Sequence, residues 1–277
     1  MRGIVTPDDL REFRSICEKR IEELDPDRTA ELALSGGTDS MTILFSMLST
    51  DRRPHCISFY VHGVESTDIK ASRYVCKYFG LELTEVKLPS APHEVIADIK
   101  RVLPHCAVIK PTIVQCMIPW LYIYPAMRGS YMLNGLGGDD HYCNQLKVQK
   151  DLHANGEESV LKYRQCYTDD INFSGGNIKR FAEVYQKRNE DFYNCAEITD
   201  WFRQFTVRAI NKPYDKYPSI AAFADFYRLG RFKRAHSSYQ INSGLKDSHL
   251  RLLDTQYNRR NAKSIVAIYN DLAANHA

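Results

Sequence analysis

Apolar positions along the chain first follow a helical spacing and then alternate between strand-like and helix-like segments. In residues 8–24 they recur mostly every three or four positions, which predicts one amphipathic helix; its stripe is Leu10, Phe13, Ile16, Cys17, Ile21 and Leu24. From Ala30 onward, short apolar runs alternate with helical spacings. We expect strands at residues 30–34, 56–61, 81–88, 106–109 and 131–133, and helices at residues 39–48, 67–79, 92–103 and 113–127.

This alternation predicts an α/β fold, because parallel neighbouring strands need a long crossover that a helix supplies. We expect a parallel five-stranded sheet with helices on both faces. Beyond about residue 150 the strand pattern fades into polar turns, such as residues 172–177, and into segments rich in Tyr, Phe and Arg. The chain therefore divides into an α/β domain with an amino-terminal helix (residues 1–150) and a mostly helical region packed on it (residues 151–277), which completes the active site.

Composition narrows the class of protein. Of the 277 residues, 44% are hydrophobic and 26% charged, which is typical of a globular protein and excludes a disordered one. The net charge of +3 is too small for the whole chain to coat nucleic acid or a membrane. Residues 201–263 hold 13 Lys and Arg against 4 Asp and Glu, so any nucleic-acid preference would be local.

Targeting and cysteine patterns add two expectations. The amino terminus has no signal-peptide pattern, and the longest apolar run, residues 116–127, is too short to cross a bilayer. We expect a cytoplasmic protein without a membrane partner. The eight cysteines form no CxxC pair, which favours reduced core thiols over a structural zinc site.

The first candidate site is a glycine loop, Ser35-Gly36-Gly37-Thr38-Asp39-Ser40, which follows an apolar strand and opens a helix. Unpaired N–H groups and the positive dipole end of a helix bind anions, and two glycines let the backbone wrap closely around a phosphate. The loop is neither a nucleoside triphosphatase P-loop nor a dinucleotide GxGxxG pattern. A plain turn with Ser35 or Asp39 as helix cap is the alternative. Because strand, glycines, acid and helix coincide, we favour phosphate binding.

A second glycine loop follows another expected strand about 100 residues later, Asn134-Gly135-Leu136-Gly137-Gly138-Asp139-Asp140. Taken alone it is weak evidence, since acidic Gly-rich turns commonly join a strand to a helix. In a parallel sheet, however, ligands bind beyond the carboxyl ends of the strands. The two loops are therefore expected to belong to one site.

Both loops resemble those of a known family. SGGTDS resembles the SGGxDS signature of the PP-loop ATP pyrophosphatases, which cleave ATP between its α- and β-phosphates, and NGLGGDD resembles the SGxGxDE loop of the asparagine synthetase synthase domain. The resemblance implies an adenine nucleotide alpha hydrolase-like fold with ATP and Mg²⁺ as cofactors. It implies Asp39 and Asp139 as metal ligands, with Asp140 in place of the usual Glu. The ATP and pyrophosphate contacts that it implies are Ser35, Gly36, Gly37, Thr38, Asp39, Ser40, Phe59, Gly135, Gly137 and Gly138.

Two later segments match the same family more weakly. Lys212-Pro213-Tyr214-Asp215 resembles its PFLD segment, and residues 229–237 resemble its R-x-K-x-x-F-S stretch. In the family that lysine lies over the phosphates, so the resemblance implies Lys233 as a catalytic cation beside Asp39 and Asp139. A solvated lysine on a helix face is the alternative.

The chain departs from the family at two points. No amino-terminal glutaminase domain is expected, since residue 2 is arginine rather than a nucleophilic cysteine. The nitrogen donor would then be ammonia, an amine substrate or a separate amidotransferase. The family usually carries Glu at the position of Leu136, and a leucine cannot transfer a proton. This places asparagine synthesis itself in doubt but leaves ATP cleavage intact.

Three functions follow as hypotheses. The leading one is an AMP-forming ligase that adenylates a small-molecule carboxylate or similar oxygen nucleophile, releases pyrophosphate and transfers the activated group to ammonia or an amine. The second is modification of a nucleobase in tRNA or DNA, supported by the basic residues 201–263, although exposure of that stretch to solvent or triphosphate is favoured over nucleic acid. The third is a degenerate nucleotide-binding interaction module, for which Leu136 is the best argument.

Overall fold

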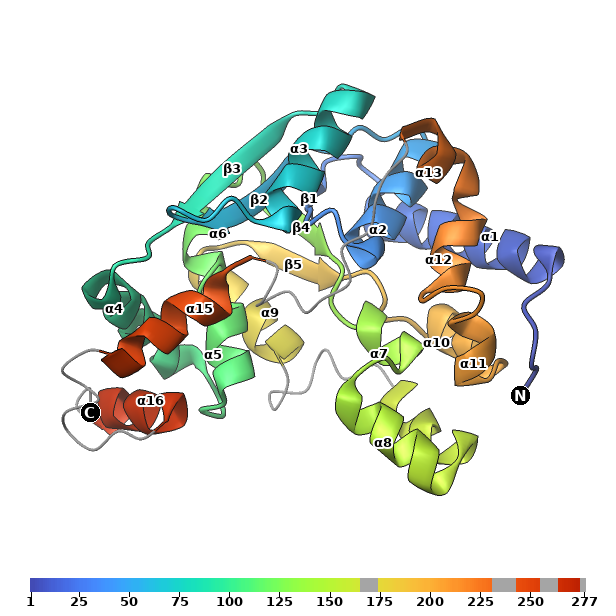
Figure 1. The fold of residues 1–277 in the computed structure, drawn as a ribbon. Helices are drawn as coiled ribbons and strands as arrows, with labels where there is room; N and C mark the ends of the chain where they lie inside the picture. The colour runs from blue at the N-terminus through green and yellow to red at the C-terminus, as the bar shows by residue number, and fades with distance from the viewer. Residues whose placement is uncertain (165–173, 231–242, 255–263, 275–277) are drawn as a thin grey trace.

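A parallel sheet of five strands forms the centre of the molecule (Figure 1). The computed structural model describes residues 1–164, 174–230, 243–254 and 264–274. Within these ranges the strand order is β3-β2-β1-β4-β5, and each neighbouring pair is parallel. The strands are β1 (Glu31–Ala33), β2 (Cys56–Val61), β3 (Leu83–Leu88), β4 (Tyr131–Asn134) and β5 (Arg188–Asp191). The predicted α/β class with a parallel five-stranded sheet is confirmed.

Helices connect the strands and dominate the carboxyl-terminal half. Those before β5 are α1 (Pro7–Leu24), α2 (Thr38–Ser49), α3 (Thr67–Phe79), α4 (Pro92–Val102), α5 (Pro111–Met117), α6 (Trp120–Ala126), α7 (Gly138–Tyr142), α8 (Leu146–Asn155) and α9 (Ser174–Val184), with 3₁₀ helices η1 (Leu103–His105) and η2 (Glu157–Arg164). Those after it are α10 (Ala196–Arg203), α11 (Val207–Ile210), α12 (Tyr217–Ala222), α13 (Ala224–Gly230), α15 (Leu245–Leu250), η3 (Arg251–Asp254) and α16 (Ile265–Ala274).

Alternate side chains of the strands enter two apolar clusters on opposite faces of the sheet. Leu32 is in register with both Cys56 and Leu133, and all three join the cluster that contains side chains of α1, α2, α10 and α12. Ile57 and Met132, which are sequence neighbours of Cys56 and Leu133, join the other cluster. That cluster contains side chains of α4, α5, α6, α9, α15 and α16. The two groups of helices lie on opposite sides of the sheet (Figure 1), as the period-2 pattern of the strands requires.

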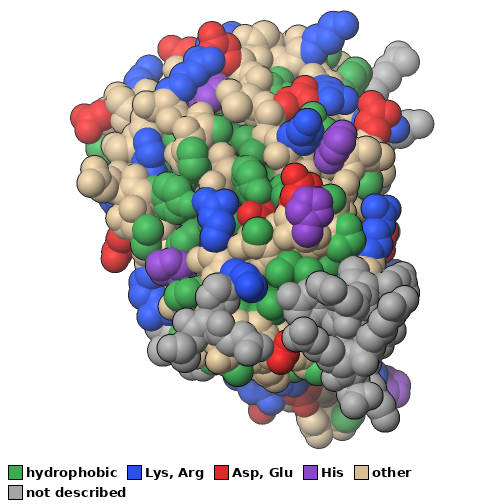
Figure 2. Space-filling model, turned by 90° about the vertical axis from the view of Figure 1, so that its left-hand side faces the viewer, with side chains coloured by type: hydrophobic (Ala, Val, Ile, Leu, Met, Phe, Trp, Pro, Cys, Tyr) green, Lys and Arg blue, Asp and Glu red, His purple; other side chains and the backbone are tan. Residues whose placement is uncertain are grey.

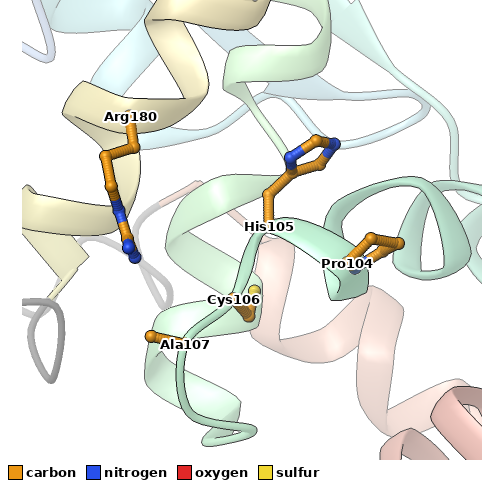
Figure 3. Close-up of a pocket in the computed structure, with 5 residues that line it drawn as sticks. All are labelled: Pro104, His105, Cys106, Ala107 and Arg180. Atoms are coloured by element: carbon orange, nitrogen blue, oxygen red, sulfur yellow. The ribbon is translucent and has the colours of Figure 1, made fainter.

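The strand predicted at residues 106–109 is wrong. These residues form a loop after η1 that lies against α9, where Ala107 N–H donates a 2.9 Å hydrogen bond to Asn177 Oδ1. The loop and Arg180 of α9 line a cavity of about 250 Å³ (Figure 3). Arg180 also donates to Asn177 Oδ1, at 3.2 Å. A polar side chain of α9 therefore satisfies a backbone donor that a neighbouring strand would otherwise pair.

The fifth strand is instead β5, which lies in the half expected to be mostly helical. It pairs with β4 from Tyr131↔Arg188 to Asn134↔Asp191 and forms one edge of the sheet. The sheet thus draws on residues from both sides of position 150, and the domain boundary placed there stays a prediction. The polar turn expected at residues 172–177 also differs, because residues 174–177 form the first turn of α9, with Gly175, Gly176 and Asn177 buried. Packing of α9 against α5 overrides the low helix propensity of the glycines.

Two further features bear on the earlier expectations. Within the described ranges, no helix combines the length and the apolar character that crossing a membrane demands. Each cysteine in those ranges is a free thiol, and Cys17, Cys56, Cys76 and Cys143 are buried.

A buried histidine makes the stability of the fold depend on pH. Burial lowers the pKa of His249 to about 4, and its Nδ1 lies 2.5 Å from the hydroxyl of Tyr269. In the unfolded chain the imidazole of His249 binds a proton near pH 6.5, whereas in the folded protein it does so only near pH 4. The stability that the neutral His249 contributes is therefore complete above pH 6.5 and falls as the pH drops toward 4. Between pH 7 and 5 we expect wild-type protein to lose about 1–2 kcal/mol more than His249→Asn, measured by urea unfolding. The control His62→Asn, at an exposed histidine, should lose as much stability over this pH range as wild type. If His249→Asn also loses as much as wild type, His249 is not the source of the pH dependence.

Candidate nucleotide and metal site

The two glycine loops lie side by side at the carboxyl end of the sheet. The first runs from the end of β1 to α2, and the second runs from the end of β4 to α7. Because β1 pairs directly with β4, the helices that follow begin close together. A Cβ built on Gly135 would lie 3.2 Å from Asp39 Cβ, which shows how closely the second loop approaches the first. The expectation that both loops belong to one site therefore agrees with their placement.

The first loop is held in a shape that only glycine accommodates at one position. Gly36 has φ +72°, and a Cβ there would overlap Cβ of Ala71 in α3. Gly37 caps α2, and its N–H donates to Ser35 Oγ at 3.2 Å. Ser35 N–H donates to Ser40 Oγ, also at 3.2 Å. The loop is therefore fixed by its own hydroxyls, and it leads into the amino-terminal turn of α2, whose N–H groups favour an anion.

The second loop is pressed against Asp39. A Cβ on Gly138 would lie 2.6 Å from Asp39 Cγ, so only glycine fits at the start of α7. Asn134 at the end of β4 braces this loop: its Oδ1 accepts from Leu136 N–H at 2.8 Å, and its Nδ2 donates to Asn189 Oδ1 of β5 at 2.6 Å. The backbone of the loop is thereby connected to the edge strand.

Asp39 and Asp139 meet at one ammonium group. Lys216 Nζ lies 2.6 Å from Asp39 Oδ2 and 2.5 Å from Asp139 Oδ1. The lysine side chain is 7% exposed, against 19% for Asp39 and 60% for Asp139. Burial alone would lower the pKa of Lys216, but the two carboxylates outweigh it and raise the pKa above the ordinary lysine value. Lys216 is therefore a permanent cation between two acids.

The segment that presents Lys216 is anchored to α7. Lys216 precedes α12 with φ +56°, and its N–H donates to Asn211 Oδ1 at 3.1 Å. Asn211 Nδ2 donates in turn to the carbonyl of Tyr142 at 2.8 Å. The hydroxyl of Tyr142 lies 2.5 Å from Ser219 Oγ of α12. Sequence reasoning missed Lys216; its one signal was its place directly after the Lys212–Asp215 segment.

The residues present fit Mg²⁺ and a polyphosphate. Carboxylate oxygens are the ligands that Mg²⁺ prefers, and these two already face a single cation, so the space between them accepts positive charge. The amino-terminal turn of α2 lies beside Asp39 and favours negative charge. Mg²⁺ bound by Asp39 and Asp139 would neutralise phosphate charge there.

Comparison with known proteins identifies the family. The model of the family described as asparagine synthase matches residues 21–241. The chain belongs to the asparagine synthase family. This family is part of the PP-loop ATP pyrophosphatase class, so the chain is of an ATP-using class.

Comparisons with curated proteins and with solved structures add little to the family assignment. No curated protein matches the chain. Among solved structures, the chain is similar to the U34-tRNA thiolase NcsA from Methanococcus maripaludis with its 4Fe–4S cluster, at 14% sequence identity and a TM-score of 0.35. That match covers 94% of this chain and 78% of the thiolase chain.

Several positions implied by the family resemblance have a defined place in the structure. Thr38 and Ser40 lie in the first turn of α2, and Gly137 has φ +85° before α7. Phe59 of β2 is 8% exposed and its side chain packs in the apolar cluster, so only its backbone and neighbours could reach an adenine. Lys233 lies outside the described residues.

Two residues of the second loop differ from the usual family pattern. Leu136 packs against the apolar cluster that contains Ile57 and Met132. Burial, followed by the charge of Asp139, raises the pKa of Asp140 to about 6, and Gln145 Nε2 donates to its Oδ1. At the position where the family carries Glu, this protein has an apolar packing residue.

Proposed function

We propose that this member of the asparagine synthase family is an Mg²⁺- and ATP-dependent ligase that forms AMP and pyrophosphate. The observation that carries the proposal is the meeting of Asp39 and Asp139, from two adjacent strand ends, beside the first turn of α2. That arrangement brings two carboxylates together beside a helix amino terminus, and such a terminus favours a phosphate group. Phosphoryl and nucleotidyl transfer depend mainly on such positioning and charge compensation.

In the proposed reaction an oxygen of a carboxylate attacks the α-phosphorus of ATP. The bond between that phosphorus and the oxygen bridging to the β-phosphate breaks, and pyrophosphate leaves. An amine or ammonia then attacks the acyl carbon, and AMP leaves with the former carboxylate oxygen. The α2 turn and the Ser35–Gly37 loop would bind phosphate, while Asp39 and Asp139 would hold the metal.

Leu136 bears on the second half of the reaction. Because its side chain can neither take nor give a proton, it cannot activate the incoming nucleophile, a role that a Glu at this place could fill. Its packing against the second apolar cluster gives it a structural use instead. We therefore propose that the nitrogen donor arrives as a neutral amine or is deprotonated by another group, and that the product need not be asparagine.

Nucleobase modification is the second candidate, and among the described residues on the face that Figure 2 draws, no gathering of basic side chains favours it. On the side of the molecule where α4, α15 and α16 lie, Lys and Arg side chains are interspersed with Asp and Glu in the part that the structure describes (Figure 2). Within the basic residues 201–263, Lys216 is buried in the site and Arg203 lies 3.6 Å from Asp200. Nucleic-acid binding needs basic groups gathered along one surface.

A screen of acceptor-dependent ATP–pyrophosphate exchange tests the proposal. Amino acids, other carboxylates, tRNA and single-stranded DNA would each be added with Mg²⁺ and ATP, with Asp39→Ala as the inactive control. We expect exchange and AMP formation with one class of small carboxylate. Exchange with nucleic acid alone would favour nucleobase modification. If ATP raises the melting temperature but no acceptor yields AMP, the protein is a nucleotide-binding module and the ligase proposal is wrong.

A further inference from the structure

Lys216 lies where the proposed metal ion would lie. Its ammonium nitrogen is 2.6 Å from Asp39 Oδ2 and 2.5 Å from Asp139 Oδ1. A Mg²⁺ ion held by the same two carboxylate oxygens would occupy the same space, because both oxygens already contact the ammonium nitrogen. Two carboxylates and one ammonium carry a net charge of −1, so the lysine neutralises most of the repulsion that would otherwise separate the acids. Ammonium and metal ion cannot both occupy this position.

The fold builds this placement with several contacts. Lys216 is separated from Asp39 by 177 positions, yet its side chain is only 7% exposed. Its backbone is fixed by Asn211, and its Nζ lies 5.6 Å from the centre of the Tyr142 ring, on the same helix as Asp139. A lysine exposed on the surface would not have both its backbone N–H and its ammonium group fixed by such contacts.

Charge decides when a metal ion can replace the lysine. Free Mg²⁺ would have to displace a buried cation from two acids and leave that cation without a counter-charge. ATP carrying Mg²⁺ brings the metal ion and also negative phosphate oxygens that can take over the ammonium. Metal binding at these acids is then favourable with the nucleotide and unfavourable without it.

We propose that Lys216 takes the place of the metal ion between Asp39 and Asp139 in the nucleotide-free protein and transfers to the phosphates when Mg-ATP binds. The inference rests on the proposed function in one respect, that these two acids are the Mg²⁺ ligands. It makes Lys216 a phosphate-binding residue, and it makes occupation of the metal site conditional on the nucleotide.

Mn²⁺ binding to nucleotide-free protein, followed by electron paramagnetic resonance, tests the inference. We expect Lys216→Met to bind Mn²⁺ at least about tenfold more tightly than wild type and to bind Mg-ATP at least about tenfold more weakly. The exposed Lys212→Met, from the same segment, should match wild type in both measurements. Equal Mn²⁺ affinity of Lys216→Met and wild type would overturn the proposal.

Thermal melting separates this role from a structural one. Lys216→Met should melt lower than wild type in the absence of metal and recover with millimolar MgCl₂, because the ion replaces the lost cation. A lysine that only stabilises the fold would leave a deficit that MgCl₂ does not restore.

Wild-type protein provides a test that needs no variant. If nucleotide-free wild type binds Mn²⁺ as tightly as Mn²⁺ is bound in the presence of ATP, Lys216 does not exclude the metal and the proposal is wrong. None of these measurements involves adenylation. The inference can therefore fail while AMP formation stands, and AMP formation can fail while the inference stands.

Discussion

Replacement of Asp39 by Asn is expected to lower acceptor-dependent ATP–pyrophosphate exchange by about 10²- to 10³-fold, the effect of removing one preorganised charge from a reaction centre. Asparagine keeps the shape that Gly138 and Gly135 pack against but removes the negative charge that faces Lys216 and Asp139. The site then loses half of its carboxylate charge for a metal ion. Initial exchange rates at saturating ATP, together with the ATP concentration dependence, would measure the loss.

Asp8→Asn is the matched control for this variant. Asp8, like Asp39, is an acid in the first turn of a helix, but it is exposed and pairs with Arg11 on the surface. If Asp39 acted only on the helix dipole, both variants would lose a few tenths of a kcal/mol of stability and keep their exchange rates. Exchange that survives in Asp39→Asn would show that this loop has been assigned to the wrong chemistry.

Gly36→Ala is expected to lower the free energy of unfolding by about 2–5 kcal/mol. The positive φ of Gly36 costs an alanine about 1–2 kcal/mol, and the added Cβ would overlap Ala71, with overpacking worth about 1–3 kcal/mol more. The loop and α3 must separate to make room, so nucleotide binding should weaken together with stability. Urea unfolding and the ATP-induced shift in melting temperature would measure the two effects.

Gly63→Ala isolates the backbone contribution. Gly63 has φ +79°, but a Cβ there meets nothing within 4 Å, so only the strain of the left-handed backbone, about 1–2 kcal/mol, should appear. The double variant Gly36→Ala/Ala71→Gly removes the overlapping methyl group and should recover part of the loss despite the helix cost of glycine, about 1 kcal/mol. Equal destabilisation by Gly36→Ala and Gly63→Ala would show that the contact with α3 does not matter.

Four of the five strands were predictable because their apolar residues alternate or cluster. Ile57, Phe59 and Val61 in β2 all join one apolar cluster, whereas Cys56 joins the other, so the predicted alternation is present in the structure. The strand β5 has the sequence Arg-Asn-Glu-Asp, without an apolar residue. It forms at the edge of the sheet, where pairing with β4 supplies its hydrogen bonds and charged side chains are favoured. Its existence depends on a partner strand that a local pattern does not contain.

The error at residues 106–109 has the opposite cause. Cys106, Val108 and Ile109 are apolar, but Pro104 and Pro111 flank them, and the backbone between is bonded by a side chain of α9 rather than by a strand. An apolar run shows that a segment is partly buried, and it does not show which backbone partner it finds.

In the site, too, residues marked by a local sequence motif were predictable, whereas a residue brought in by tertiary packing was not. The glycines and acids of the two loops were predictable because each loop carries its glycines, its acid and its helix start within a few residues. Lys216 was not, because its role depends on the packing of α12 against α1 and α2 and on a backbone anchored to Asn211. A lysine distant in sequence becomes a partner of Asp39 only after the chain has folded.

The amino-terminal helix has a consequence for where this protein can be divided. Arg14 of α1 donates to Asp225 Oδ2 at 3.0 Å, and Phe13 and Cys17 share an apolar cluster with Ile220 and Phe223. The segment shared with the family begins at residue 21, after all of these contacts. A shortened protein starting there would retain both glycine loops but lose the α1 side chains that pack against α12, the helix that directly follows Lys216. The unit that must fold together therefore extends beyond the segment that members of the family have in common.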